Sequence, residues 1–246
     1  MPLINFLLKH PDEILPFGNG PDKSLHWFGL TDGNLWLQPG EVKLYEYTDS
    51  FLSLLTMSDT KYVDYYLSRF VEDFTERFET ISTEVPDESY AIAKNSTTLT
   101  QFRETSKRGL DDSEESDFDQ ALEKYNALIG WIDQRELTSG HLVGSPRIGF
   151  FRNKNKISIV WQADQRTKKN IPLWTAQNGQ IEMDYSEFVA QIEDFGASFF
   201  SAMTDQVEIA LEKDWGAIKI DKLLLAEEHQ QRQIGFTNQL RYLQQS

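Results

Sequence analysis

The side chains best suited to acid–base or metal chemistry are four histidines, and they are scattered along the chain: His10, His26, His141 and His229. None of them combines with another histidine or a glutamate in the helical pattern that indicates a zinc site. His26 adjoins a tryptophan in a predicted strand, where a structural or surface role is favoured over catalysis. The sequence also lacks a glycine-rich phosphate loop, a Gly-x-Ser-x-Gly nucleophile elbow and a calcium loop. The motifs therefore predict no catalytic residue, no cofactor and no metal.

Carboxylates are numerous, with 39 aspartates and glutamates against 24 lysines and arginines, and the formal net charge is −15. Neighbouring acids such as Glu193–Asp194 and Glu227–Glu228 do not indicate a catalytic pair, because adjacent carboxylates are common in so acidic a chain. The absence of cysteine excludes disulfides, thiolate zinc sites and thiol nucleophiles. An enzyme stays an open alternative, because a carboxylate site assembles from residues that lie far apart in the sequence.

The charge bears directly on the choice of partner. A strongly negative protein repels the phosphate backbone, which argues against nucleic acid, whereas it attracts a basic protein and speeds its association. The candidate partner-binding site is an acidic run, made up of Asp111, Asp112, Glu114, Glu115 and Asp117. The competing interpretation is that these acids only cap the next helix and keep it solvated. By contrast, residues 146–180 hold seven lysines and arginines against one aspartate, a local charge of +6.

No apolar stretch reaches the roughly 20 residues that a membrane helix needs. The first nine residues contain a short apolar run, but they lack the basic region and the small-residue cleavage site of a signal peptide. We therefore expect a cytoplasmic protein with no membrane partner. A secreted protein without cysteine is the alternative.

Residues 25–37 carry the strongest local signal. Two apolar runs flank a Thr-Asp-Gly-Asn turn, which predicts a β-hairpin with Gly33 at positive φ. Trp27 and Trp36 are large enough to anchor a core around that hairpin. A third strand is expected over residues 42–47.

The pattern then changes to that of helices. Apolar residues recur at three- and four-residue steps from Asp59, which predicts a helix over 59–82. Residues 84–116 are polar and give only a helical turn at 90–93. A second amphipathic helix is expected over 116–132, with a serine cap at its start.

The second half alternates hairpins with long helices. Residues 147–161 and 174–183 are predicted to form hairpins. A helix of more than six turns should begin near Ser186, and Gly196 marks the place on it where another element is expected to approach. Asp221 should cap a last helix. No repeat or linker divides the chain, so we expect a single α+β domain over residues 1–246, with an antiparallel sheet of hairpins packed by several long amphipathic helices.

The stretch Leu25-His26-Trp27-Phe28-Gly29-Leu30-Thr31-Asp32-Gly33, followed by Trp36, resembles the opening motif of an uncharacterised family of bacterial domains. The resemblance continues in the strand at 157–161, in Trp174-Thr175-Ala176 with Gly179, and in the helix that carries Phe188, Phe195 and Met203. It covers most of the chain. Proteins of this kind are similar to the immunity side of bacterial toxin–immunity systems, and the resemblance supplies no catalytic residues.

The resemblance thus implies an immunity protein that neutralises a cognate toxin with a basic surface, by occluding the toxin's active site through its own acidic surface. A second hypothesis is an enzyme or small-molecule-binding protein with a pocket near the aromatic stretch at 25–37. A third is a structural subunit of a larger assembly. The oligomeric state stays open.

Overall fold

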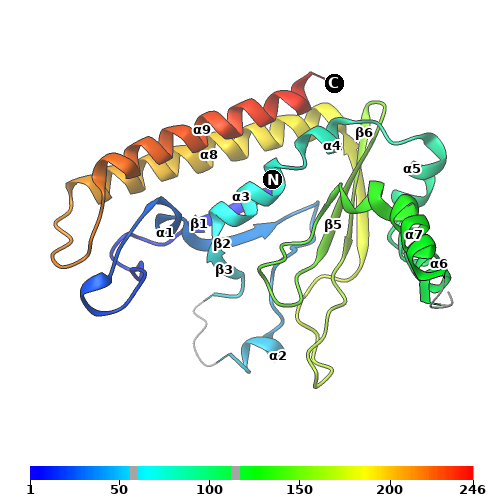
Figure 1. Cartoon of the computed structure of the whole chain (residues 1–246), viewed down its shortest axis with the longest axis horizontal. Coiled ribbons are helices and arrows are strands. Elements are labelled where there is room, and N and C mark those ends of the chain that lie inside the picture. Colours follow the sequence, from blue (N-terminus) through cyan, green and yellow to red (C-terminus); the bar gives the residue numbers. More distant parts are fainter. Residues whose placement is uncertain (56–59, 112–116, 246) are drawn as a thin grey trace.

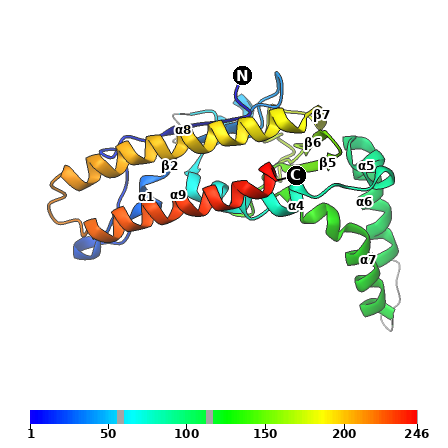
Figure 2. The same cartoon turned by 90° about the horizontal axis from the view of Figure 1, so that it is seen from above.

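The computed structural model describes residues 1–55, 60–111 and 117–245. Two long antiparallel helices run along one side of the molecule, α8 (Tyr185–Glu212) and α9 (Lys222–Gln244) (Figure 1). Two antiparallel sheets lie below them, and a pair of helices stands out at one end, α6 (Ser96–Asp111) and α7 (Phe118–Asp133) (Figure 2). The architecture is α+β, as the sequence predicts. Within the described residues, no helix has both the length and the apolar character needed to cross a membrane.

Each sheet is a simple antiparallel arrangement. The first has the order β1-β2-β3, with strands Ile4–Leu8, Asp32–Leu37 and Val63–Tyr66. The second has the order β4-β5-β6-β7, with strands Glu136–Leu137, Arg147–Asn153, Lys156–Gln162 and Gly179–Asp184. The five central residues of β5 and of β6 are all buried, so both faces of this hairpin are covered. That burial explains the almost continuous apolar runs from which the 147–161 hairpin was predicted.

Short helices connect these layers. They are a 3₁₀ turn (Gly20–Asp22), α1 (Trp27–Leu30), α2 (Asp49–Leu52), α3 (Leu67–Thr75), α4 (Phe78–Ser82) and α5 (Asp87–Ala93). The last of these accounts for the helical turn expected at 90–93. On α3 the buried side chains recur at helical spacing, and its aromatic residues face the core.

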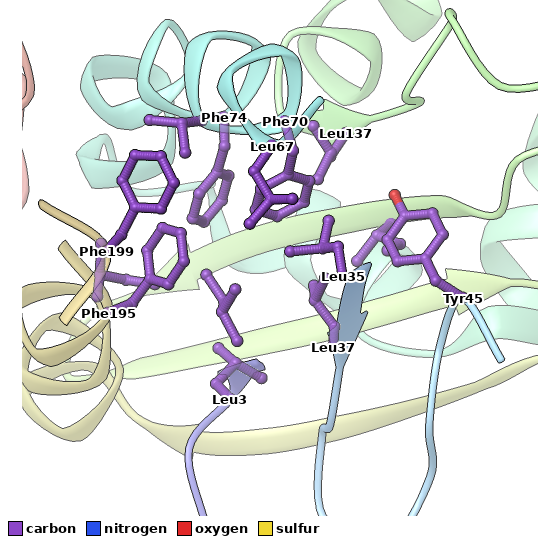
Figure 3. Close-up of a cluster of buried hydrophobic side chains, with 14 of the residues drawn as sticks. Leu3, Leu35, Leu37, Tyr45, Leu67, Phe70, Phe74, Leu137, Phe195 and Phe199 are labelled. Carbon is purple, nitrogen blue, oxygen red and sulfur yellow. The ribbon is translucent and has the colours of Figure 1, made fainter. Parts of the chain in front are cut away.

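Aromatic side chains of α8 fill the space between the first sheet and α3 (Figure 3). The ring of Phe6, from β1, meets the rings of Phe195 and Phe199 edge-on at 5.9 and 5.6 Å. Phe70, from α3, meets Phe195 at 6.4 Å in a perpendicular arrangement. Edge-to-face contacts of this kind add to the free energy gained from burying each ring. The core is thus built on α8.

The hairpin predicted for residues 25–37 is wrong. Its first half is the one-turn helix α1, and only its second half is a strand, β2, which pairs with β1 and β3 instead. Gly33 is not a turn residue: its backbone lies against Leu7 and Leu8 of β1, where a side chain would clash. Trp27 is buried as expected, whereas Trp36 is half-buried and stacks on Tyr62.

Three other boundaries also differ. In the predicted helix 59–82, Val63–Tyr66 forms β3, because this aromatic, β-branched run pairs with β2. The strand expected at 42–47 is reduced to isolated bridges, since Tyr45 has a φ of 67° and interrupts extended backbone. The hairpin expected at 174–183 has only one strand, β7, which pairs with β6.

The long helices and the 147–161 hairpin are confirmed. The side chain of Asp221 accepts a hydrogen bond from the backbone nitrogen of Leu224 at 3.0 Å, and this caps α9. Gly196 is the point of close approach between α8 and α9, because the ring of Phe236 occupies the place where its Cβ would stand. Gly235, one residue earlier on α9, faces open space.

These two glycines give a matched test of helix packing. We expect Gly196→Ala to lower the free energy of unfolding by about 1–3 kcal/mol, because the added methyl displaces the Phe236 ring. We expect Gly235→Ala to raise it by about 0.5–1 kcal/mol, since alanine is the better helix former and meets no neighbour. Chemical denaturation measures both, and shifts of the same sign would contradict the packing of α9 on α8.

Candidate functional site

The pair α6 and α7, which we call the arm, carries the acidic run at the connection between its two helices. Figure 2 shows that the arm extends away from the sheets and from the α8–α9 pair. Asp111 is the last residue of α6 and Asp117 immediately precedes α7, and both are exposed. Asp112, Glu114 and Glu115 lie outside the described residues. The structure therefore places the ends of the predicted site at the far end of the arm.

The start of α6 lies in a segment that the sequence leaves unassigned. The side chain of Asn95 accepts hydrogen bonds from the backbone nitrogens of Thr97 and Thr98, at 3.0 and 3.1 Å. A third donor, the nitrogen of Ser96, binds the side-chain oxygen of Gln180 on β7 at 3.1 Å. Asparagine is a favoured helix cap, so Asn95 was the available signal for this helix. The serine cap expected for the second helix lies outside the described residues.

Ion pairs around one buried carboxylate hold the arm to the second sheet. The carboxylate of Glu136, on β4, has a side-chain exposure of only 3% and lies 2.6 Å from the guanidinium of Arg103, on α6. It also lies 2.9 Å from the guanidinium of Arg147, on β5. Both arginines contact Asp133 at the end of α7, at 3.2 and 3.3 Å. Nothing in the spacing of these residues along the chain reveals the cluster, because four separate elements contribute to it.

A groove of about 680 Å³ runs between the two helices of the arm. Small residues make the room for it, including Gly109 on α6 and Ala121 on α7. Its walls are largely apolar, with Phe102, Tyr125 and Leu128 among the lining residues. The arm therefore offers an apolar seam beside its acidic end.

The basic stretch at 146–180 is mostly used inside the protein. Besides Arg147 in the buried cluster, the guanidinium of Arg152 donates to the last carbonyl of α4 and lies 4.1 Å from the ring centre of Tyr185. Lys154 pairs with Asp87, and Lys156 pairs with Asp184 at 2.9 Å. Four of the seven cations are thus matched by partners, and the local charge of +6 is not a free basic surface.

The opening motif forms a junction between α1 and α9. The indole nitrogen of Trp27 donates a hydrogen bond to Nδ1 of His229 at 3.2 Å, so Nδ1 carries no proton. The other ring nitrogen, Nε2, lies 3.0 Å from the hydroxyl of Thr204 on α8 and serves as the donor there. Burial lowers the pKa of His229, which keeps the ring neutral. Above the indole lies the guanidinium of Arg232, 4.5 Å from the ring centre.

A cleft of about 240 Å³ opens beside this junction, lined by Trp27, Glu72, Arg232 and Phe236 among others. The guanidinium of Arg232 in this cleft already has partners, because it forms ion pairs with Glu72 and with Glu228. His26 is exposed, stacks on Phe17 at 4.6 Å and does not line the cleft. The described residues contain no cluster of three side chains suited to a metal ion.

Residues 3–246 match a family of unknown function (DUF5984). The chain belongs to this family. No curated protein and no solved structure matches it. The family description assigns no activity.

The buried cluster at the base of the arm gives a clear stability prediction. Glu136→Gln removes the charge that faces two arginines, and we expect the free energy of unfolding to fall by about 3–5 kcal/mol. The control is Glu104→Gln, which removes an exposed partner of Arg108 within the same helix and should cost less than about 0.5 kcal/mol. Equal losses in urea unfolding would contradict a structural role for the cluster.

His229 should make stability depend on pH. Its pKa is lowered in the folded protein, so the unfolded chain binds more protons and stability falls as the pH drops below about 6.5. His141 is also buried with a lowered pKa and acts in the same direction. The measurement is therefore a comparison between wild type and His229→Gln. Wild type should lose more unfolding free energy between pH 7.5 and 5.5, and identical losses would rule out the contribution of His229.

Proposed function

We propose that this protein is an immunity protein, which binds a cognate bacterial toxin with a basic surface and occludes the toxin's active site. The observation that carries the proposal is the acidic arm, which stands apart from the body of a chain of net charge −15 (Figure 2). Residues 104–124 contain eight acids and three basic residues, a net charge of −5. The described acids of this stretch, among them Asp111 and Asp117, lie on the helices of the arm or at their ends.

Charge in this position acts on the rate of association. Summed negative potential draws a basic partner toward the arm and raises the rate of encounter, most strongly at low ionic strength. The acidic residues then take the place of the negative charge of a nucleotide or nucleic-acid substrate in the toxin's active site. The apolar groove between α6 and α7 supplies surface that can be buried once the partner has docked.

The structure favours protein recognition over the alternative of a small-molecule site beside the opening motif. The cleft next to Trp27 has a volume of about 240 Å³. Ligand pockets usually measure about 300–1,000 Å³ and keep a few polar groups free for the ligand. Here the guanidinium of Arg232 is already engaged by two carboxylates. The polar groups of this cleft therefore serve to join α9 to α1 and α3.

The test uses the product of the neighbouring gene as the candidate toxin. Asp111→Lys with Asp117→Lys should slow association at low salt by about tenfold, because two exposed acids of the arm are reversed in charge. The matched control is Asp194→Lys with Asp205→Lys, which changes the total charge equally at exposed positions of α8. Surface plasmon resonance at several salt concentrations measures the rates.

Two outcomes would overturn the proposal. If the arm variant and the α8 variant associate at equal rates, the arm is not the recognition surface. If the wild-type protein neither binds the neighbouring gene product nor protects cells that express it, the protein is not an immunity protein.

A further inference from the structure

The second sheet ends in a strand with an open edge. In the order β4-β5-β6-β7, strand β7 pairs with β6 on one side, and no strand within the described residues pairs with its other side. The backbone nitrogen of Tyr185 donates to the carbonyl of Asn155 at 2.8 Å, so residue 185 directs its backbone groups toward β6. The direction alternates from one residue to the next along an antiparallel strand. Residues 181 and 183 then direct their backbone groups toward β6, and residues 180, 182 and 184 direct theirs outward. The open edge therefore presents the donors and acceptors that another strand would need.

Two hollows lie along this edge, with volumes of about 920 and 570 Å³. Both are lined by the loop residues Pro39, Gly40 and Glu41 and by Ile181 of β7, so they meet along the strand. We call them together the edge groove. An extended backbone laid against β7 would lie within it, because neighbouring strands are about 4.8 Å apart.

The charges of the 570 Å³ hollow are mostly negative. Four exposed acids line it, Glu41, Glu182, Asp184 and Glu187, against two cations, the amino group of Met1 and Lys156, which is paired with Asp184. Gln191 also lines it, and its side-chain oxygen is buried without a hydrogen-bond partner among the described residues. Glu182 already accepts a hydrogen bond from the hydroxyl of Tyr90 at 2.8 Å. Glu41 and Glu187 form no ion pair within the described residues, and an occupant that brings positive charge would pair with them. A second copy of the chain would bring a further −15 and be repelled.

We propose that the open edge of β7 binds an extended, lysine- or arginine-rich segment of another protein, which adds to the sheet as a fifth strand. The side chains of β7 specify the pattern of that segment. Ile181 and Met183 are half-buried on one face, whereas Gln180, Glu182 and Asp184 are exposed on the other. Cross-strand neighbours interact on the same face, so apolar and basic residues alternate in the segment.

This proposal is independent of the immunity function, because the edge groove shares no lining residue with the groove of the arm. Acids at a sheet edge also keep neutral strands and other copies from pairing there. A basic peptide distinguishes the two roles of these acids. It pairs with the edge if the acids serve binding, and it does not pair if they only protect the edge.

The probe is a fluorescent eight-residue peptide of alternating valine and lysine, added to the full-length protein. We expect it to bind with anisotropy changes that saturate, and we expect an N-methylated version of the same charge to bind at least tenfold more weakly. The valine–glutamate peptide should not bind. Glu41→Lys with Glu187→Lys should weaken binding of the lysine peptide about tenfold, whereas Asp111→Lys with Asp117→Lys should leave it unchanged.

Equal binding of the N-methylated peptide would overturn the proposal, since it would show attraction by charge without strand addition. Equal loss in the arm variant would also overturn it, as would a dimer joined through β7 in sedimentation experiments. None of these results depends on a toxin. If the protein proves not to be an immunity protein, peptide binding at β7 is still expected. The experiments therefore test the immunity function and the strand addition separately.

Discussion

The structure depends on the burial of one face of α8. This helix has 28 residues and is about 42 Å long, at ~1.5 Å per residue. Its buried face is a stripe of large side chains, including Phe188, Ile192, Phe195, Phe199 and Met203. Along its length it contacts β7 and β6 of one sheet, β1 of the other, and then α1. No ladder joins the two sheets within the described residues, and the stripe on α8 packs against both of them in one core.

The opening motif belongs to the same core, and this explains its composition. Trp27 supplies a ring that packs edge-on against Phe199 at 6.5 Å and a donor that binds His229. Asp32 forms an ion pair with Lys9 at 3.0 Å, which helps hold β1 beside β2. Gly33 allows the backbone of β1 to approach. The motif is therefore a set of tertiary contacts to distant elements, although its spacing resembles a local turn.

This distinction decides how much the sequence could predict. Helical periodicity identified α8, because it carries a long apolar pattern that depends on the helix alone. The signal for α9 was its cap at Asp221, since several apolar residues of this helix are exposed. Apolar runs identified the β5–β6 hairpin for the same local reason. The prediction for 25–37 was wrong because this Asp-Gly pair stands inside a strand, where Gly33 makes room for the backbone of β1. The contacts of Glu136 and His229 with distant residues have no local signal at all.

The candidate site shows the same division between local and tertiary information. Its acids were visible in the sequence, whereas the arm that carries them depends on Asn95 and on the buried charges of Arg103 and Glu136. Each helix of the arm has 16 residues and is about 24 Å long, at ~1.5 Å per residue. Electrostatic interactions between exposed charges are screened within about 8 Å at physiological ionic strength. Acids at the end of the arm therefore repel the acids of the body only weakly, and the fold tolerates negative charge there that would destabilise it near the core.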